Sequence, residues 1–213
     1  FGKWTRYEVG VASGLVVSWP GEIKPDSKTD AIVEYVDVVP TMIDAAGSEI
    51  PESLDGRSFL PVLKGTENRH KKYAYSQQTT VGVNGVKQAY GIRSVVNERY
   101  RLVLNLFPEN EFSIPSSRRL LEETSQMGER EKQFAHRYTK RPAVELFDVL
   151  EDPYCQKNLA GESRLANQRK ILTQALEEWM LSQNDQGRST ELAAEQRQAE
   201  WKQVQYRQRD REK

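Results

Sequence analysis

Short apolar stretches separated by turn residues occupy the first third of the chain. Residues 15–19 are mostly apolar and precede a Pro-Gly pair, which predicts a buried strand that ends in a turn. Apolar side chains recur at helical spacing over residues 38–46, after Asp37 as a candidate N-cap and before Gly47 as a candidate helix-ending glycine. Residues 58–63 predict a second, short helix. A strand, a turn and a capped helix in this order are typical of the edge of an α/β domain.

A different pattern begins after the polar run 66–72. Four segments rich in aromatic and β-branched residues predict strands at 73–77, 90–95, 100–106 and 144–149. The Asn97-Glu98 pair between the second and third segments predicts a hairpin. The long charged segment 115–142 is predicted to be partly helical, and residues 164–181 predict an amphipathic helix. A small antiparallel sheet covered by this helix would bury the apolar side chains of both.

These changes of pattern divide the chain into three parts. Residues 1–65 are predicted to be the edge of a large mixed-sheet α/β domain, and residues 66–182 a small α+β domain. Residues 183–213 predict a polar tail that is either a solvated helix or disordered, because charges of mixed sign usually solvate a surface. We expect the chain to begin inside a longer protein, because residue 1 is Phe and a polar, Lys-bearing loop leads directly into the first apolar strand.

The charge balance narrows the classes of partner. The chain has 31 Lys and Arg residues and 31 Asp and Glu residues, which argues against nucleic acid as the main partner. No stretch reaches the roughly 18 apolar residues that a membrane span requires. The sequence is compatible with a homo-oligomer.

Candidate reactive side chains are few. The single cysteine, Cys155, follows Asp-Pro-Tyr in a predicted turn and is interpreted as an incidental thiol. His70 lies beside two lysines and His136 lies in a charged stretch, so both are predicted to be solvated. No carboxylate or nucleophile next to either histidine in the sequence indicates a catalytic triad.

Two arginines interrupt the predicted strands. Arg93 and Arg101 are predicted to form structural pairs across the sheet with Glu145 or Asp148. This structural interpretation is preferred to a role in binding substrate.

An ordered set of motifs resembles a known enzyme family. The motifs are Gly2-Lys3-Trp4-Thr5-Arg6-Tyr7-Glu8, Trp19-Pro20-Gly21, Val36-Asp37-Val38-Val39-Pro40-Thr41, Leu54-Asp55-Gly56-Arg57-Ser58, Gly91-Ile92-Arg93-Ser94-Val95, Arg99-Tyr100-Arg101-Leu102-Val103, Glu145-Leu146-Phe147-Asp148 and Glu151-Asp152-Pro153-Tyr154. In this order they resemble the C-terminal half of a type I sulfatase, of the alkaline phosphatase superfamily. The resemblance covers residues 1–182, and residues 90–106 most resemble the heparan N-sulfatase branch.

The resemblance implies a two-domain α/β enzyme that hydrolyses a sulfate ester or a sulfamate on a sugar or glycan. Such enzymes attack sulfur with a formylglycine, made from Cys in a Cys-x-Pro/Ala-x-Arg motif, and bind Ca²⁺ through Asp and Asn. Lys3 matches a basic position of the family that contacts the sulfate, where a fixed cation stabilises developing charge. Without the resemblance, Lys3 reads as a solvated loop residue. Family members work in extracytoplasmic compartments, which is the expected location.

The chain departs from the family pattern at several positions. It has no Cys-x-Pro/Ala-x-Arg motif and no Asp-rich segment, so the nucleophile and the Ca²⁺ ligands are expected upstream of residue 1 and the chain alone is expected to be inactive. Relatives often have His-Thr-Thr-Arg-Gly after the first C-terminal strand, where this chain has Gln78-Thr79-Thr80-Val81-Gly82. Gln78 and Thr79 are therefore candidate substrate-binding residues, and the loss of two potential anion contacts leaves the substrate open.

Two other functions stay open from the sequence. The protein could be a phosphoester or phosphonate hydrolase of the same superfamily, which the upstream nucleophile and metal ligands would reveal. It could also be a non-catalytic relative that binds anionic glycans or serves as an assembly module. The missing nucleophile, the altered residues 78–82 and the polar tail support this second alternative.

Overall fold

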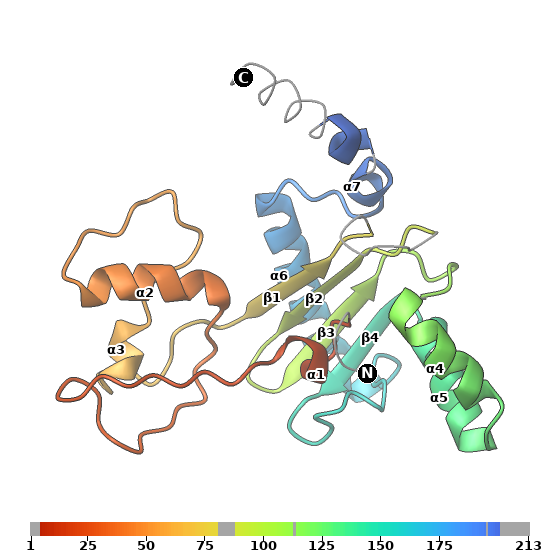
Figure 1. Ribbon diagram of the computed structural model, residues 1–213, viewed down its shortest axis with the longest axis horizontal. Coiled ribbons are helices and arrows are strands. Elements are labelled where there is room, and N and C mark those ends of the chain that lie inside the picture. The colour runs from red at the N-terminus through yellow and green to blue at the C-terminus, as the bar shows by residue number, and fades with distance from the viewer. Residues whose placement is uncertain (1–4, 81–87, 113, 195, 201–213) are drawn as a thin grey trace. The chain divides into compact units, whose positions relative to one another are not determined.

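The computed structural model describes residues 5–80, 88–112, 114–194 and 196–200 (Figure 1). Its contacts form two compact units. The sheet unit contains the N-terminal residues to Val11, Tyr75–Val95 and the chain from Arg101 onward, and the helix–loop unit contains Ala12–Ala74 and Val96–Tyr100. These units differ from the predicted parts 1–65, 66–182 and 183–213, because residues 5–11 and 185–191 pack within the sheet unit. The predicted domain division of the longer protein stays a prediction.

A four-stranded antiparallel sheet organises the sheet unit. Its strands are β1 (Ala74–Gln78), β2 (Ile92–Val96), β3 (Tyr100–Asn105) and β4 (Val144–Asp148), which lie in the order β1-β2-β3-β4. All four lie within one or two residues of the predicted strands. The Asn97 N–H donates to the Tyr100 carbonyl at 3.0 Å, and the Asn97 side chain accepts two further backbone N–H bonds, so the predicted hairpin is confirmed.

Aromatic side chains form the core of this unit. The buried cluster consists of Tyr7, Tyr90, Ile92, Val103, Phe112, Ile114, Tyr138, Phe147 and Cys155. The ring of Phe112 packs against Tyr90 at 4.9 Å and against Tyr138 at 5.3 Å between centroids. The core thus joins a residue near the N-terminus to strands and helices far along the chain.

The segment between β3 and β4 forms two helices. They are α4 (Pro115–Ser125), which starts with a proline in its first turn, and α5 (Glu129–Thr139), which has acidic residues in its first turn and His136 and Arg137 in its last. The prediction of partly helical structure is confirmed here. Ala135 and Tyr138 are the described side chains of α5 that are buried.

The longest helix covers one face of the sheet. Helix α6 (Ala166–Ser182) follows the 3₁₀ turn η2 (Ser163–Leu165) and lies behind the sheet in Figure 1, as predicted for residues 164–181. It buries Leu172, Ala175, Leu176 and Met180. The Trp179 ring stacks on Tyr75 of β1, with centroids 5.0 Å apart and planes 3° apart. In the described parts of the chain, no helix is long and apolar enough to cross a membrane.

The beginning of the predicted tail is part of the sheet unit. After α6 the chain forms the short helix α7 (Arg188–Leu192), and the carboxylates of Asp185 and Glu191 are buried. Both pair with Arg93, so the prediction of a solvated or disordered tail is wrong for residues 185–191. Residues 201–213 lie outside the described residues.

Short helices joined by loops form the helix–loop unit. These are the 3₁₀ turn η1 (Tyr35–Asp37), α2 (Val38–Ala45) and α3 (Leu60–Leu63), which match the predicted helices. Gly47 has φ of +72°, and the Ser48 N–H donates to the Ile43 carbonyl at 3.1 Å, as expected for a helix-ending glycine. Ile32 and Lys71 form an isolated antiparallel bridge.

The predicted strand at residues 15–19 is not formed. Leu15 is 48% exposed and Val16 is 94% exposed, and the segment has no strand partners among the described residues. A strand requires a neighbour for its backbone N–H and C=O groups, so apolar composition alone is insufficient. The short helix α1 (Glu8–Val11), which precedes this segment, belongs to the sheet unit.

Candidate functional site

The segment that follows Lys3 is anchored on the front face of the sheet unit. Thr5 is 0% exposed and Tyr7 is 1% exposed, and the Tyr7 ring packs edge-on against Phe147 of β4 at 5.5 Å. The Tyr7 hydroxyl donates to the Glu145 carboxylate, with both oxygens at 3.1 Å. Burial raises the pKa of Tyr7 above its ordinary value, so this hydroxyl keeps its proton.

Glu145 is the polar centre beneath this segment. Besides Tyr7, Asn105 donates to it through Nδ2 at 2.9 Å, and the Arg141 guanidinium lies over the Tyr7 ring at 5.3 Å. Burial raises the pKa of Glu145, although Asn105, Arg141 and Tyr7 act in the opposite direction. Glu145 therefore fixes Tyr7, and the prediction that it pairs with Arg93 or Arg101 is wrong.

Glu8 attaches the same segment to the sheet by a second set of bonds. Its carboxylate accepts from Arg101 Nε at 3.0 Å and Nη2 at 2.6 Å, so Arg101 pairs with Glu8 rather than with Glu145 or Asp148. The Glu8 N–H points at Cys155 Sγ at 3.5 Å. Burial raises the pKa of Cys155 to about 11, which keeps the thiol protonated and supports its interpretation as a thiol without a catalytic role.

Arg6, which directly precedes these anchors, has no carboxylate partner in the described chain. The residue is half-buried, and its Nε atom is buried with no hydrogen-bond partner among the described residues. Burial lowers the pKa of Arg6, and the neighbouring Arg101 and Arg93 guanidinium groups lower it further. Since Arg101 and Arg93 each pair with carboxylates, Arg6 carries the uncompensated charge of the three. From the sequence, Arg6→Ala is predicted to have a much smaller effect than Lys3→Ala, because only Lys3 matches the family's sulfate-contacting position.

The three predicted site residues fall in two places. Lys3 lies outside the described residues, two positions before the buried Thr5. Gln78 is the last residue of β1 and Thr79 follows it, so these two lie together at one end of the sheet. Their roles stay predictions.

Gln78 is more buried than a surface loop residue. Its side chain is buried, and Oε1 has no hydrogen-bond partner among the described residues. Its carbonyl accepts from Arg93 Nη1 at 3.2 Å. Thr79 is half-buried, and the Thr80 hydroxyl accepts from the Tyr90 N–H at 2.7 Å. The end of β1 is therefore held by bonds from two other segments.

A buried ion-pair network supports this end of β1. Arg93 is 0% exposed and donates through Nε to Asp185 and through Nη2 to Glu191 Oε1 at 2.8 Å. Glu191 Oε2 also accepts from the Thr80 N–H at 2.9 Å. Burial lowers the pKa of Arg93, but the two carboxylates outweigh burial and raise it overall. The predicted partners Glu145 and Asp148 are wrong for Arg93, because the acids come from the segment after α6.

Asp37 is the centre of a polar cluster in the helix–loop unit. Its carboxylate accepts from the backbone N–H of Glu34 at 2.9 Å and of Arg57 at 3.0 Å, and pairs with Lys71 Nζ at 2.8 Å. It precedes α2 as predicted, but its side chain does not cap this helix. His70 Nε2 lies 3.3 Å from Asp37, with its side chain 5% exposed, so the prediction that His70 is solvated is wrong.

No metal centre accompanies these clusters. Among the described residues, no group of three or more His, Cys, Asp or Glu side chains could hold a metal ion. The carboxylates of the clusters are already occupied by arginine, lysine and tyrosine donors. The chemical group that the described site offers is the Arg6 guanidinium, which has no carboxylate partner in the described chain. The same segment continues upstream to Lys3.

Several relatives align with most of this chain. An ulvan-active sulfatase of Formosa agariphila is 29% identical over 189 residues, which are 86% of this chain and 36% of the relative. Human N-sulphoglucosamine sulphohydrolase is 29% identical over 212 residues, which are 86% of this chain and 39% of that enzyme. The chain thus spans well under half the length of the relatives it matches.

Solved structures share the fold. A structure described as a complex with its substrate D-glucosamine-2-N,6-O-disulfate matches 79% of this chain and 28% of its own, with a TM-score of 0.54 and 22% identity. A sulfatase structure from Bacteroides fragilis matches 79% of this chain and 29% of its own, with a TM-score of 0.51 and 20% identity. The predicted α/β sulfatase architecture is confirmed at the level of fold.

The family model described as "N-sulphoglucosamine sulphohydrolase, C-terminal" matches residues 1–116, more than half of the chain. The matched region includes the Gly2–Glu8 motif, the anchored segment and strands β1 to β3. The chain belongs to the C-terminal family of the N-sulphoglucosamine sulphohydrolase sulfatases.

Proposed function

We propose that this chain is the C-terminal part of a sulfatase that hydrolyses a sulfate ester or sulfamate on a sugar or glycan. The observation that carries the proposal is the family match over residues 1–116, which includes the Lys3 motif. The printed names of relatives support the substrate class: ulvan-active sulfatase, N-acetylglucosamine-6-O-sulfatase and N-sulphoglucosamine sulphohydrolase. Sulfated saccharides are the chemistry that these names share.

Lys3 is the proposed sulfate-contacting residue of the chain. Hydrolysis moves negative charge onto the leaving oxygen or nitrogen, and a fixed cation stabilises this charge more in the transition state than in the bound substrate. The anchoring of Tyr7 and Glu8 supports this role, because it fixes the described residues that follow Lys3 to the sheet unit.

We propose that Arg6 is a second cation that contacts the sulfate group of the substrate. A half-buried guanidinium without a carboxylate is destabilising unless an anion neutralises it. The planar guanidinium group of arginine can donate two parallel hydrogen bonds to the oxygens of a sulfate. Arg6 and Lys3 together would neutralise more of the sulfate charge than either residue alone.

Gln78 and Thr79 are proposed to line the substrate pocket. The unpartnered Oε1 atom of Gln78 can accept a hydrogen bond from a sugar hydroxyl or N–H group, and Thr79 offers a hydroxyl. An amide in place of the family's frequent His makes this contact neutral, which favours recognition of the sugar over recognition of a further anion.

The formylglycine nucleophile and the Ca²⁺ of the family do not fit the described residues. Cys155 is buried, has a raised pKa and lies outside a Cys-x-Pro/Ala-x-Arg motif, and the described residues contain no metal-binding cluster. Both groups are therefore proposed for the part of the protein outside this chain. We also propose an extracytoplasmic location, on the grounds of family membership.

The test measures sulfate release by the whole protein. The substrates are N- and O-sulfated glucosamine, with a phosphate monoester and a phosphonate ester as the competing chemistries. Lys3→Ala is expected to lower kcat/KM by roughly 10²-fold, comparable to the loss of one strong electrostatic contact, and Lys3→Arg is expected to retain part of the activity. The matched control is Lys28→Ala, which removes an exposed lysine of the helix–loop unit.

Two results would contradict the proposal. A protein that cleaves the phosphorus esters but no sulfate would belong to the competing class of hydrolase. A protein that turns over none of these substrates while binding sulfated saccharides would be a non-catalytic relative. A kinetically silent Lys3→Ala variant that is folded would reject the role of Lys3 alone.

A further inference from the structure

A groove between α5 and the loop after β4 has the composition of a saccharide-binding site. It has a volume of about 530 Å³ and is lined by Arg130, Gln133, Phe134, Arg137, Tyr154 and Gln156. This volume falls within the roughly 300–1,000 Å³ of typical ligand sites. The groove lies wholly within the sheet unit and outside residues 1–116, which the family model matches.

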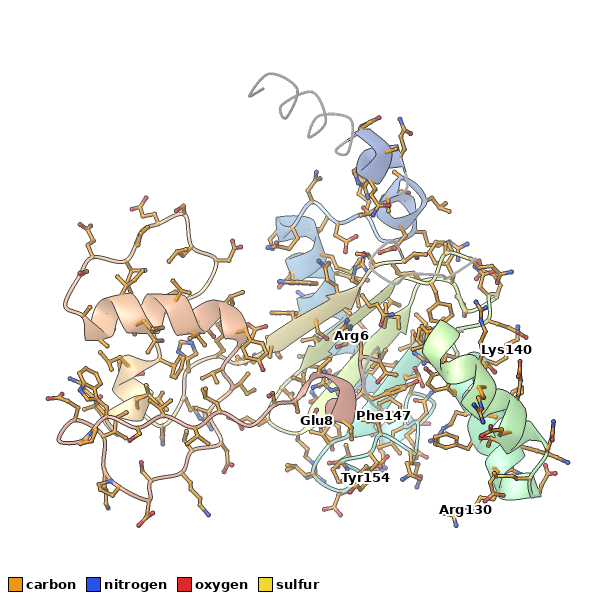
Figure 2. All side chains as sticks on the ribbon, viewed as in Figure 1. Arg6, Glu8, Arg130, Lys140, Phe147 and Tyr154 are labelled. Atoms are coloured by element: carbon orange, nitrogen blue, oxygen red, sulfur yellow. The ribbon has the colours of Figure 1, made fainter. Side chains whose placement is uncertain are left out.

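Two of the lining side chains are exposed aromatic rings. Phe134 of α5 is 43% exposed, and Tyr154 of the loop, which is labelled in Figure 2, is 63% exposed. Aromatic side chains normally bury most of their surface, so two exposed rings in one groove indicate a binding surface. The flat apolar face of a pyranose ring suits such a surface, and the Tyr154 hydroxyl adds a polar contact.

The charge of the groove defines the ligand further. Arg130 and Arg137 line it, and none of the six lining residues is acidic. Arg130 is exposed and has no carboxylate partner among the described residues. Gln133 and Gln156 add planar amides that can bind hydroxyl or sulfate oxygens. Cations beside aromatic rings and amides select an anionic sugar over a neutral one.

The groove is fixed before any ligand binds. Arg137 of α5 donates to the Gln156 carbonyl and so ties the helix to the loop. The loop itself is held by the Cys155 N–H bond to the Asp152 carbonyl at 2.9 Å and by the Lys157 N–H bond to the Asp152 carboxylate at 2.8 Å. A preformed site avoids part of the entropic cost of binding.

We propose that this groove binds a sulfated stretch of a glycan chain as an accessory site. The class of ligand rests on the proposed function, since a sulfatase that acts on a glycan chain meets many sulfated sugars besides the one it cleaves. The groove holds the chain through Arg130 and Arg137 on the sulfates and through Phe134 and Tyr154 on the sugar rings. It raises the local concentration of long substrates without taking part in the reaction.

Binding and turnover are measured separately on the whole protein. A heparin-derived hexasaccharide is titrated into protein carrying Lys3→Ala, which slows turnover roughly 10²-fold under the proposed function, and its Kd is measured by calorimetry. Arg130→Gln is expected to raise Kd roughly three- to tenfold, and the double variant Arg130→Gln/Tyr154→Ala at least about tenfold. Arg137 is left intact because it braces the loop. The control Arg119→Gln removes an exposed arginine of α4 that pairs with Glu123 outside the groove, and its Kd should stay unchanged.

Turnover of a small aryl sulfate provides the second readout, in protein with Lys3 intact. The groove variants should leave its kcat/KM unchanged, because this substrate is too short to reach an accessory site. The chemically desulfated hexasaccharide should bind at least about tenfold more weakly than the sulfated one.

Three results would overturn the groove proposal: an unchanged Kd in the double variant, equal affinity for the desulfated hexasaccharide, or a parallel loss of aryl sulfate turnover. Failure of the proposed function has a different signature. The protein would release no sulfate from any substrate, while hexasaccharide binding would still depend on Arg130 and Tyr154.

Discussion

The ion-pair network of Arg93 yields the sharpest prediction about stability. Glu191→Gln keeps the shape of the side chain and removes its charge. In the native protein one carboxylate oxygen accepts from Arg93 Nη2 at 2.8 Å and the other from the Thr80 N–H at 2.9 Å. An amide has a single acceptor oxygen, so in the variant its NH₂ group must face one of these two donors.

The expected cost follows from these two bonds. A hydrogen bond to a charged group contributes about 1.5–3 kcal/mol, and Asp185 still neutralises Arg93 in the variant. Glu191→Gln should therefore destabilise the local structure by about 2 kcal/mol, which is roughly a 30-fold loss of protection. The double variant Asp185→Asn/Glu191→Gln leaves Arg93 buried without a counter-ion, for which about 3–5 kcal/mol is expected.

Hydrogen exchange measured by mass spectrometry on the whole protein is the appropriate assay, because it reports local opening in a chain with more than one unit. Peptides that cover β2 and residues 185–192 should lose protection, while peptides of the helix–loop unit should not. The control is Glu123→Gln, which breaks an exposed pair with Arg119 on α4 and should change stability by less than about 0.5 kcal/mol. If β2 were as protected in Glu191→Gln as in this control, the network would not hold Arg93 and the reasoning would be refuted.

Two further predictions concern the helix–loop unit. Burial lowers the pKa of His70 from 6.5 and outweighs the opposing effect of Asp37, so the unfolded chain binds the proton more readily than the folded protein. The stability that depends on neutral His70 should therefore be complete above pH 6.5 and be lost as the pH falls through the lowered pKa. Thermal unfolding measured over this pH range should show a smaller loss of stability in His70→Gln than in the native protein. Gly56→Ala would put a Cβ atom 1.9 Å from the Val36 carbonyl oxygen. Hydrogen exchange of residues 31–45 should therefore show a loss of local stability of at least about 2 kcal/mol. Gly14→Ala is the control and should be neutral, because its Cβ atom would have no other atom within 4 Å.

Local patterns were sufficient for the regular elements of the sheet unit. The strands β2 to β4 and the helix α6 carry their own periodicity, and Asn97 carries its own turn preference, so neighbours in sequence determined the result. The prediction of a strand at residues 15–19 was wrong because a strand needs a second strand as its hydrogen-bonding partner, and the local pattern does not show whether one is present.

The polar partners could not be predicted for a related physical reason. Arg93 and Glu191 are 98 positions apart, and a single Glu in a polar segment looks the same whether it is solvated or buried. One signal was available. Arg93 shares a predicted strand with Ile92 and Val95, and a buried guanidinium requires carboxylates, so acids should have been sought throughout the chain.

The segment after α6 connects these findings to the proposed site. Glu191 binds the Thr80 N–H, and Arg93, held by Glu191 and Asp185, binds the Gln78 carbonyl. The backbone on both sides of Thr79 is therefore fixed by residues from the predicted tail. If Gln78 and Thr79 contact the sugar, this segment sets the position of the substrate without touching it. Loosening it would then raise KM for the glycan more than it lowers kcat, since Arg6 and the other described residues that follow Lys3 are attached to the sheet through Tyr7 and Glu8 instead.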